Sequence, residues 1–365
     1  MSQLLSPLAL RGLTLANRIV VSPMCQYSAD DGRAGEWHVI HLGHLALGGA
    51  GLLFVEATAV APDGRITPGC VGLWSDACAE ALGNVLAAVR RHAPTPLAVQ
   101  LAHAGRKASQ RRPWDGGGRA PAAEGGWQPV APSPLPYEPG DPPPAALDRA
   151  GLARVREAFA AAARRAARLG FAAAELHAAH GYLLHQFLSP LSNGRDDDYG
   201  GPLANRMRFP LEVFQAVRAV WPADRPLGAR ISATDWVEGG WDLESSVAFA
   251  RELAARGCDF VDCSSGGLAP EQRVTPAPGY QVPFATRIRK DAGVATIAVG
   301  LITEPRQAEA IVASGQADLV ALGRGMLFDP RWPWRAAAEL GGRVFAPPQY
   351  LRAAPAAAPD LFRRP

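Results

Sequence analysis

The feature that most constrains the fold of this chain is a regular alternation of short apolar segments with longer amphipathic ones. The apolar segments, which predict strands, are residues 19–23, 52–55, 97–101, 172–176, 227–231, 260–263, 295–299 and 319–322. Each is followed by a segment with helical periodicity, at 37–47, 76–92, 147–168, 205–220, 243–256, 283–290, 305–313 and 332–340. Apolar strands that each lead into an amphipathic helix are typical of a parallel sheet buried on both faces.

Eight such units within 365 residues predict an α/β fold, a closed (β/α)8 TIM barrel rather than an open doubly wound sheet. A nucleotide-binding doubly wound fold is the alternative. However, no Gly-x-Gly-x-x-Gly follows the first strand, and the glycines at 116–118 lie in a long loop. We therefore expect one barrel domain over residues 1–340 and a C-terminal tail over residues 341–365.

The connection after the third strand, residues 105–146, is unusual for this fold. It is dense in Pro and Gly and is too long for an ordinary strand-to-helix loop. Two interpretations follow from this composition. The segment is either a lid or surface excursion over the mouth of the barrel, or a disordered insertion.

Composition narrows the class of protein. The net charge is +3, and no long basic run carries interleaved aromatic residues, so nucleic acid is not an expected partner. The five cysteines are odd in number and form no CxxC clip, which favours free thiols in a reducing cytoplasm. We also expect no membrane association, because the sequence has no secretory signal pattern and no apolar stretch of about 18 residues.

In a barrel of this type the active site lies at the carboxyl ends of the strands, and this directs the search for functional residues. Three late strand ends carry glycines, at 266–267, 300 and 323–325, and Arg324 lies within the last of these. Backbone N–H groups together with a guanidinium are suited to a phosphate group. Turn glycines beside a surface Arg are the alternative, but three neighbouring strand ends favour phosphate.

Two other strand ends carry side chains suited to a flat heterocycle. Arg230 ends the fifth strand, where a guanidinium needs an anion or an electron-rich ring edge. Gln100, on the third strand, can both donate and accept hydrogen bonds. A structural salt bridge and a core amide are the respective alternatives. Cys25 follows the first strand, and we interpret it as a contact that tunes a cofactor rather than as a nucleophile.

His177, His180 and Tyr182 lie within six positions directly after the fourth strand. Such a group can bind a metal, hold an oxyanion or transfer a proton. A metal would need further ligands from other strands, for which the candidates are His103, Glu175 and Asp235. The chain has no close carboxylate pair, and this makes the metal interpretation the less favoured one.

A second histidine group, His38, His41 and His44, recurs at a spacing of three within the first predicted helix. Successive members are rotated by about 60° around the axis of a helix, so the three spread over its surface. We expect packing or surface histidines here rather than metal ligands.

In their order along the chain, these motifs resemble the old yellow enzyme family of flavin-dependent ene-reductases, in its smaller bacterial, thermophilic-like branch. The matching pieces are Asn17–Ile19, Ser22–Tyr27, Trp37–His38, Val55–Thr58, Gln100–Lys107, His177–Tyr182, Phe187–Pro190, Tyr199–Gly201, Arg230–Ser232, Val299–Ile302 and Leu322–Arg324. Each piece alone is weak, whereas the ordered set, which spans nearly the whole chain, is very specific.

The resemblance implies noncovalently bound FMN. The residues expected around the isoalloxazine ring are Ser22, Pro23, Met24, Cys25, Ala57, Gln100 and Arg230, and those expected at the phosphate are Gly300, Gly323 and Arg324. Cys25 would modulate the redox potential of the flavin, and Tyr27 would lie in the substrate pocket.

The resemblance further implies a ping-pong reaction. NADPH or NADH would reduce the flavin, which would then reduce the activated C=C bond of an α,β-unsaturated carbonyl or nitro compound. The substrates would be small electron-poor alkenes. His177 and His180 would bind the substrate oxygen and Tyr182 would supply the proton, with no metal involved.

At the C-terminus, Arg352 resembles a residue that reaches into the active site of the neighbouring subunit in related enzymes, which implies a homodimer or homotetramer. The Gly-Trp pair that often follows this Arg in the branch is replaced here by Ala353-Ala354-Pro355. Two other functions remain as alternatives. One is a metal-dependent TIM-barrel hydrolase with His177 and His180 as ligands, and the other is a barrel that binds a phosphorylated ligand without catalysis.

Overall fold

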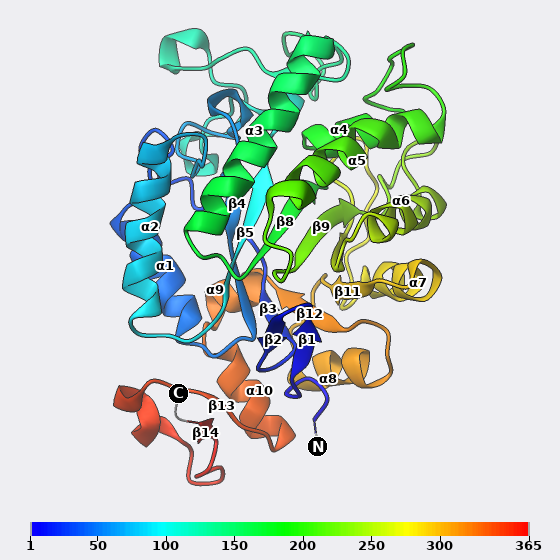
Figure 1. Cartoon of the computed structure of the whole chain (residues 1–365). Coiled ribbons are helices and arrows are strands. Elements are labelled where there is room, and N and C mark those ends of the chain that lie inside the picture. The colour runs from blue at the N-terminus through cyan, green and yellow to red at the C-terminus, as the bar shows by residue number, and fades with distance from the viewer. Residues whose placement is uncertain (1, 364–365) are drawn as a thin grey trace.

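Parallel strands form a closed barrel at the centre of the molecule, and the computed structural model describes residues 2–363 (Figure 1). Around the barrel the eight strands follow one another in the order β10, β11, β12, β3, β4, β5, β8 and β9. Their bounds are Ile19–Val21 for β3, Leu52–Ala59 for β4, Leu97–Ala102 for β5, Ala173–Ala178 for β8, Leu227–Ser232 for β9, Phe260–Ser264 for β10, Ala295–Ala298 for β11 and Leu319–Leu322 for β12. The predicted (β/α)8 barrel is confirmed, because every predicted strand forms one of these.

Helices surround the barrel and connect its strands (Figure 1). The predicted helices correspond to α1 (Glu36–Ala46), α2 (Asp76–Arg90), α3 (Arg149–Arg168), α5 (Leu203–Val220), α6 (Leu243–Ala255), α7 (Val282–Ala292), α8 (Pro305–Ala313) and α10 (Trp332–Leu340). The short helices α4 (Leu183–Leu188) and α9 (Arg324–Phe328) were not predicted. Six and five residues are too few to display a helical period in the sequence.

An antiparallel hairpin of β1 (Leu8–Leu10) and β2 (Leu13–Leu15) closes the end of the barrel at which the strands begin. Leu10 and Leu15 of this hairpin belong to one buried cluster with residues from inside the barrel, including Phe54 and Phe260. The rings of Phe54 and Phe260 lie 6.2 Å apart between centroids. Because apolar side chains fill this end, polar functional groups can gather only at the other end, where the strands terminate.

The long connection after β5 is a folded excursion. It contains the short 3-10 turns η2 (Gly105–Lys107), η3 (Pro113–Asp115) and η4 (Ala122–Glu124), and β6 (Val130–Ala131) pairs with β7 (Ala145–Ala146). The Arg106 guanidinium donates to the carbonyls of Leu135 and Pro136 within the excursion and to that of Leu268 after β10. These contacts favour the excursion interpretation over the disordered insertion, and they place the segment beside the carboxyl ends of the strands.

The C-terminal residues lie against α10, at the opposite end of the molecule from the excursion (Figure 1). The strand β13 (Val344–Phe345) pairs with β14 (Phe362–Arg363), and the 3-10 helix η5 (Pro348–Ala353) lies between them. The Phe362 ring packs on Trp334 at 4.7 Å between centroids. The tail is thus attached to the barrel through aromatic packing.

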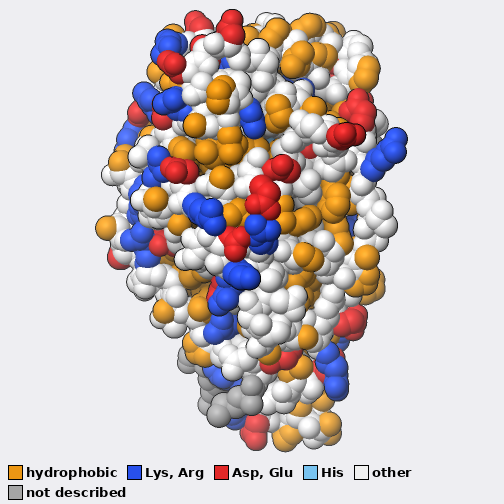
Figure 2. Space-filling view, turned by 90° about the vertical axis from the view of Figure 1, so that its right-hand side faces the viewer, with side chains coloured by type: hydrophobic (Ala, Val, Ile, Leu, Met, Phe, Trp, Pro, Cys, Tyr) orange, Lys and Arg blue, Asp and Glu red, His pale blue; other side chains and the backbone are white. Residues whose placement is uncertain are grey.

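The surface mixes charges of both signs, in agreement with the small net charge. Figure 2 shows Lys and Arg side chains interspersed with Asp and Glu over one face. Within residues 2–363, we find no helix that is long and apolar enough to span a membrane.

Candidate active site

A cavity of about 310 Å³ opens at the carboxyl ends of β3, β9, β11 and β12. Seven of the residues predicted to bind the cofactor line it, namely Ser22, Pro23, Met24, Arg230, Gly300, Gly323 and Arg324. Tyr280 and Gln281, at the beginning of α7, complete one wall. The structure therefore brings the predicted ring and phosphate residues of four strands into one space.

Two polar groups at this cavity fit a bound flavin. Ser22 Oγ is buried and has no hydrogen-bond partner within residues 2–363. A buried hydroxyl of this kind needs a ligand to satisfy it. Arg230 Nε is buried as well and forms an ion pair with Asp262 Oδ2 at 3.3 Å. At Gly323 an added Cβ would come no nearer than 3.7 Å to another atom, so the backbone there is accessible from the cavity. The donor set suits a heterocycle edge at one side and an anion at Arg324.

The other glycines predicted to contact a phosphate are placed differently. The amide of Gly266 donates to the carbonyl of Thr234, and that of Gly267 donates to the side chain of Gln272. Neither residue lines the cavity. The interpretation of these two glycines as phosphate ligands is therefore wrong, because their N–H groups are already used within the protein.

Gln100 and Arg230 each contact a buried carboxyl group on the neighbouring strand. Gln100 Nε2 donates to Glu175 Oε1 at 2.9 Å, and Arg230 Nε lies 3.3 Å from Asp262 Oδ2. Burial raises the pKa of Glu175 well above its usual value, and the nearby Asp262 raises it further. Burial also raises the pKa of Asp262, although Arg230 opposes this shift. A single guanidinium thus faces two buried carboxyl groups, and the pKa of each carboxyl is raised by burial.

His177, His180 and Tyr182 form a compact group at the end of β8. The rings of His177 and His180 are 5.1 Å apart between centroids, and Tyr182 packs edge-on against His177 at 4.8 Å. His177 Nε2 lies 3.3 Å from His180 Nδ1. The prediction that these side chains converge on one point is thus matched by their geometry.

The backbone after β8 makes a turn that is unusual for residues with a side chain. His180 has a φ of 58° and Gly181 one of 73°, and a Cβ on Gly181 would lie 2.2 Å from the carbonyl oxygen of Gly267. Lys107 Nζ donates to the carbonyls of His180 and Gly267, at 2.9 and 2.8 Å. The His180 N–H donates to Ser232 Oγ at 2.9 Å. Bonds from two segments, at Lys107 and Ser232, therefore hold the backbone of His180 in its left-handed conformation.

Electrostatics keep this group neutral. Burial lowers the pKa of His177 and of His180 well below 6.5, and the positive charge of Arg230 lowers both further. Burial raises the pKa of Tyr182 well above 10. At neutral pH the two imidazoles are uncharged and the phenol is protonated, which suits hydrogen-bond donation to an oxygen that gains charge.

The remaining predicted ring and pocket residues surround Tyr182. Ala57 and Tyr182 both line a small hollow of about 10 Å³. Cys25 is partly exposed, and burial of its thiol raises its pKa well above 9. Tyr27 has a φ of 50° and packs on Trp114 of the excursion, with 6.0 Å between ring centroids. The thiol is therefore uncharged, in agreement with a contact role rather than a nucleophilic one.

The structure places one of the three helix histidines in the interior. His38 is 1% exposed, its Nδ1 accepts from the Gly35 amide, and its Nε2 lies 3.4 Å from Glu56 Oε1. Glu56 Oε2 accepts from the amide of Gln26. His38 is therefore a packing residue behind the segment that carries Cys25.

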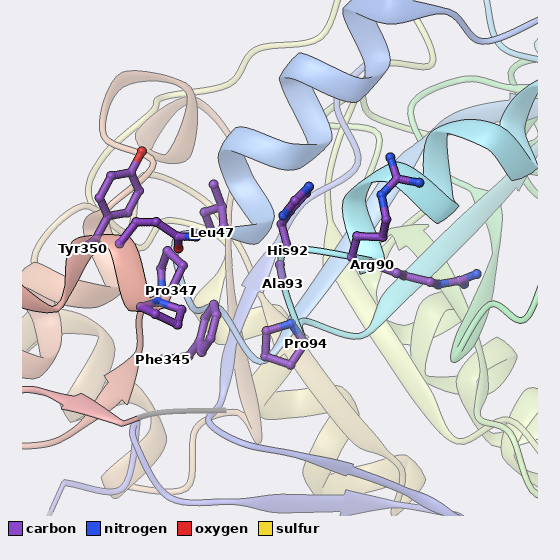
Figure 3. A pocket seen from close by; sticks show the side chains of 11 residues that line it. Leu47, Arg90, His92, Ala93, Pro94, Phe345, Pro347 and Tyr350 are labelled. Atoms are coloured by element: carbon purple, nitrogen blue, oxygen red, sulfur yellow. The ribbon is translucent and has the colours of Figure 1, made fainter.

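Arg352 lies outside this site. It belongs to η5, beside a separate groove of about 570 Å³ between the tail and the ends of α1 and α2 (Figure 3). The groove is lined by Leu47, Arg90–Pro94, Phe345 and Pro347–Tyr350. None of the predicted site residues is among them, and Arg352 is not among the residues that line the cavity at the strand ends.

Several residues of the site were missed from the sequence. Lys107, Ser232, Ser264 and the carboxyl of Asp262 contact the predicted residues directly. Glu175 was considered only as a metal ligand, whereas in the structure it accepts from Gln100. One signal was available for Lys107, because it is one of only two lysines in the chain and follows the third strand closely.

A TIM barrel with a cavity at the carboxyl ends of its strands, an Arg that lines this cavity and uncharged hydrogen-bond donors beside it has the features expected of a flavin-dependent oxidoreductase. Comparison with known proteins gives the family. The model of the NADH:flavin oxidoreductase / NADH oxidase family matches residues 3–341. The chain belongs to this family, that of the old yellow enzymes, and its cofactor is FMN.

The chain is similar over nearly its full length to curated relatives. It is 46% identical to an NADPH dehydrogenase of Geobacillus thermodenitrificans (strain NG80-2), covering 96% of this chain and 98% of the relative. It is 44% identical to an NADPH dehydrogenase of Listeria innocua, covering 97% and 99%. Among solved structures, morphinone reductase superposes with a TM-score of 0.77 at 31% identity, covering 94% of this chain and 91% of the other.

Family membership also bears on the hydrolase alternative. A metal-dependent hydrolase finds no support in a chain of a flavin oxidoreductase family. Within the described part of the chain, no group of three or more His, Cys, Asp or Glu residues is arranged to hold a metal ion.

Proposed function

We propose that this enzyme is an ene-reductase that uses NADPH or NADH to reduce the activated C=C bond of α,β-unsaturated carbonyl or nitro compounds. The observation that carries the proposal is the convergence of His177 Nε2 and His180 Nδ1, 3.3 Å apart, beside the protonated phenol of Tyr182. Uncharged donors grouped in this way suit an oxygen that gains negative charge during a reaction. The relatives named NADPH dehydrogenase support a nicotinamide as reductant.

The residues proposed to hold FMN fall into two sets. Those proposed for the ring are Ser22, Pro23, Met24, Cys25, Ala57, Gln100 and Arg230, and those for the phosphate are Gly300, Gly323 and Arg324. When bound, FMN accepts a hydride from the nicotinamide and delivers one to the alkene, so that the two substrates use the site in turn. Arg230 and Gln100 orient the edge of the flavin ring, because Arg230 is held by Asp262 and Gln100 by Glu175.

The side chains after β8 act on the substrate. His177 and His180 donate to the carbonyl or nitro oxygen and orient the alkene, and such donors are each worth about 2.7–4 kcal/mol in a transition state. Tyr182 donates its phenolic proton to the α-carbon, which becomes basic as the β-carbon receives the hydride. Tyr27 and Trp114 pack together at the side of the excursion and form a wall of the substrate entrance.

We further infer a homodimer or homotetramer. Arg352 is exposed on its own subunit and lies away from the cavity, so it can contribute to a site only in a neighbouring subunit. All five cysteines are free thiols, which supports a reducing cytoplasm as the location. The alternative, a protein that binds a phosphorylated ligand without catalysis, does not explain why His177, His180 and Tyr182 are grouped together.

The test of the proposed function separates the two half-reactions. The Tyr182→Phe variant should slow alkene reduction about 10²- to 10⁴-fold, since general acid catalysis typically contributes that much. Reduction of the flavin by NADPH should be nearly unchanged, because that step requires no proton from the phenol. Both rates are measured by anaerobic stopped-flow absorbance, with cyclohexenone as oxidant.

Two results would count against the proposal. Equal losses in both half-reactions would show that Tyr182 only shapes the site. A parent enzyme that reduces no activated alkene after NADPH has bleached its flavin would exclude ene-reduction itself.

A further inference from the structure

The hydrogen bonds around His177 fix which of its ring nitrogens carries the proton. Its Nδ1 accepts from the backbone N–H of Ala179 at 3.3 Å. A neutral imidazole has one donor and one acceptor nitrogen, so the proton is on Nε2. This N–H points to the side of the ring where His180 Nδ1 lies, 3.3 Å away.

The ring of His180 has two possible forms, and only one of them assists a substrate oxygen. Burial and the charge of Arg230 lower its pKa, so the ring is neutral and carries a single N–H. With the proton on Nε2, Nδ1 would accept from the Nε2–H of His177, and neither imidazole would have an N–H free for a substrate oxygen. With the proton on Nδ1, the N–H groups of His177 and His180 converge on one acceptor.

Ser264, the last residue of β10, contacts the far side of this ring. Its Oγ lies 2.7 Å from His180 Nε2, and its side chain has no other hydrogen-bond partner within residues 2–363. Ser264 is only 4% exposed. If the ring donated to Ser264, the buried hydroxyl proton would be left without an acceptor, which is costly. If the hydroxyl donates to Nε2, that proton is satisfied, and the N–H left on Nδ1 faces the partly exposed side of His180.

We propose that Ser264 is a positioning residue of the active site: its hydroxyl donates to His180 Nε2 and so keeps the ring proton on Nδ1, where it meets the substrate oxygen. Two N–H groups cannot satisfy one another, so the pair formed in this way requires an acceptor beside it. In the proposed reaction the carbonyl or nitro oxygen of the substrate is this acceptor. The inference rests on the proposed function of the His177–His180 pair.

The experiment reads the proton position directly. The FMN-loaded enzyme is labelled with [15N]histidine, and the ring nitrogens of His180 are assigned by comparison with the His180→Asn spectrum. In the parent enzyme with bound cyclohexanone, which cannot be reduced, Nδ1 should have the shift of a protonated nitrogen and Nε2 that of an unprotonated one. Ser264→Ala should move His180 toward the opposite form, whereas Ser264→Thr, which keeps the hydroxyl, should retain the parent pattern.

A binding measurement accompanies the spectra. The dissociation constant of cyclohexanone, followed by the flavin absorbance, should rise about five- to tenfold in Ser264→Ala, as expected for one lost hydrogen bond. The matched control is Ser265→Ala, the same change one residue later, whose hydroxyl donates to Gln281 instead of His180. It should leave the His180 shifts as they are in the parent.

The proposal is overturned if His180 in the ligand-bound parent carries its proton on Nε2, or if Ser264→Ala changes neither the shifts nor the affinity. These readouts need no turnover. An enzyme that gave the expected shifts but reduced no alkene would contradict the proposed function and would still support the role of Ser264.

Discussion

Asp235 offers a quantitative test of how the turn after β8 is held in place. Its side chain is fully buried, and Oδ2 accepts from Ser189 Oγ at 2.6 Å and from the Trp241 N–H at 2.8 Å. Oδ1 lies 2.9 Å from His185 Nε2. His185 Nδ1 in turn accepts from the Gly181 N–H, so its Nε2 carries the ring proton and lies beside the Asp235 carboxylate. A buried carboxylate thus supports the His180–Gly181 turn through one histidine.

The change Asp235→Asn keeps the shape of the side chain but replaces one acceptor with an NH2 group. If the amide oxygen remains with Ser189 and Trp241, the NH2 faces the N–H of His185 and two donors meet. The lost charge-assisted bond is worth about 1.5–3 kcal/mol, and a buried unsatisfied donor costs about 1–3 kcal/mol. We expect the free energy of unfolding to fall by about 3–5 kcal/mol, from these two losses together.

The assay is urea unfolding of the FMN-loaded protein at one fixed excess of FMN, since bound ligand adds to stability. The matched control is Asp242→Asn. Asp242 is an exposed helix cap that accepts from the Ser245 N–H, and Asn caps helices as well as Asp does. The control should change stability by less than about 0.5 kcal/mol. A loss below about 1 kcal/mol in Asp235→Asn would refute the argument from the buried charge.

The same carboxylate gives a pH dependence with a definite sign. Burial alone would raise the pKa of Asp235, but His185 and the bonds from Ser189 and Trp241 outweigh it, and the pKa lies below its usual value. A depressed pKa means stability that is present above the unfolded value, near 3.9, and lost as the pH falls through the folded value. Asp235→Asn should therefore remove part of the acid sensitivity of unfolding below about pH 4.

Three further predictions follow from the site. Burial raises the pKa of Cys25, so iodoacetamide should modify it at pH 8 more slowly than in the urea-unfolded protein, as measured by mass spectrometry, and equal rates would contradict a neutral thiol. The low pKa values of His177 and His180 predict no inflection near pH 6.5 in the rate constant of alkene reduction, measured by stopped-flow; a step there would mean that one ring becomes charged. Gly181→Ala should lower the free energy of unfolding in urea more than Gly201→Ala does. Both glycines have a φ of 73°, but only at Gly181 would an added Cβ meet another atom, the carbonyl oxygen of Gly267 at 2.2 Å. Similar losses in the two variants would show that the loop at Gly267 moves to accept the Cβ.

The barrel could be predicted from the sequence because its signals are local. Each strand and each long helix has a hydrophobic pattern that can be recognised in its own segment of sequence. The carboxyl ends of parallel strands lie at the same end of the barrel regardless of the loop conformations. This was enough to bring Arg230 and Gly323 to one cavity. The tertiary partners could not be predicted in this way, since the contact of His180 with Ser264 joins residues 84 positions apart.

The glycines at 266–267 also show that tertiary hydrogen-bond partners cannot be predicted from local sequence. Their position at a strand end correctly predicted closeness to the site, but it did not reveal that Gln272 and Thr234 use their amides. The pKa of Tyr182 is a further case. A phenol in water is a fair reference from sequence alone, whereas the burial that raises its pKa exists only once the barrel has closed.

Arg106 and Lys107 have a consequence for how the chain can be cut and rejoined. Their donors reach carbonyls in the excursion, in the turn after β8 and in the loop after β10. Neighbours along the sequence thereby bind segments up to 162 positions away. A chain split into two fragments between 107 and 268 would leave these donors and their acceptors on separate pieces. Break points for a split enzyme that keeps these contacts within one fragment therefore lie outside this span, and the contacts form only after β10 has joined the barrel.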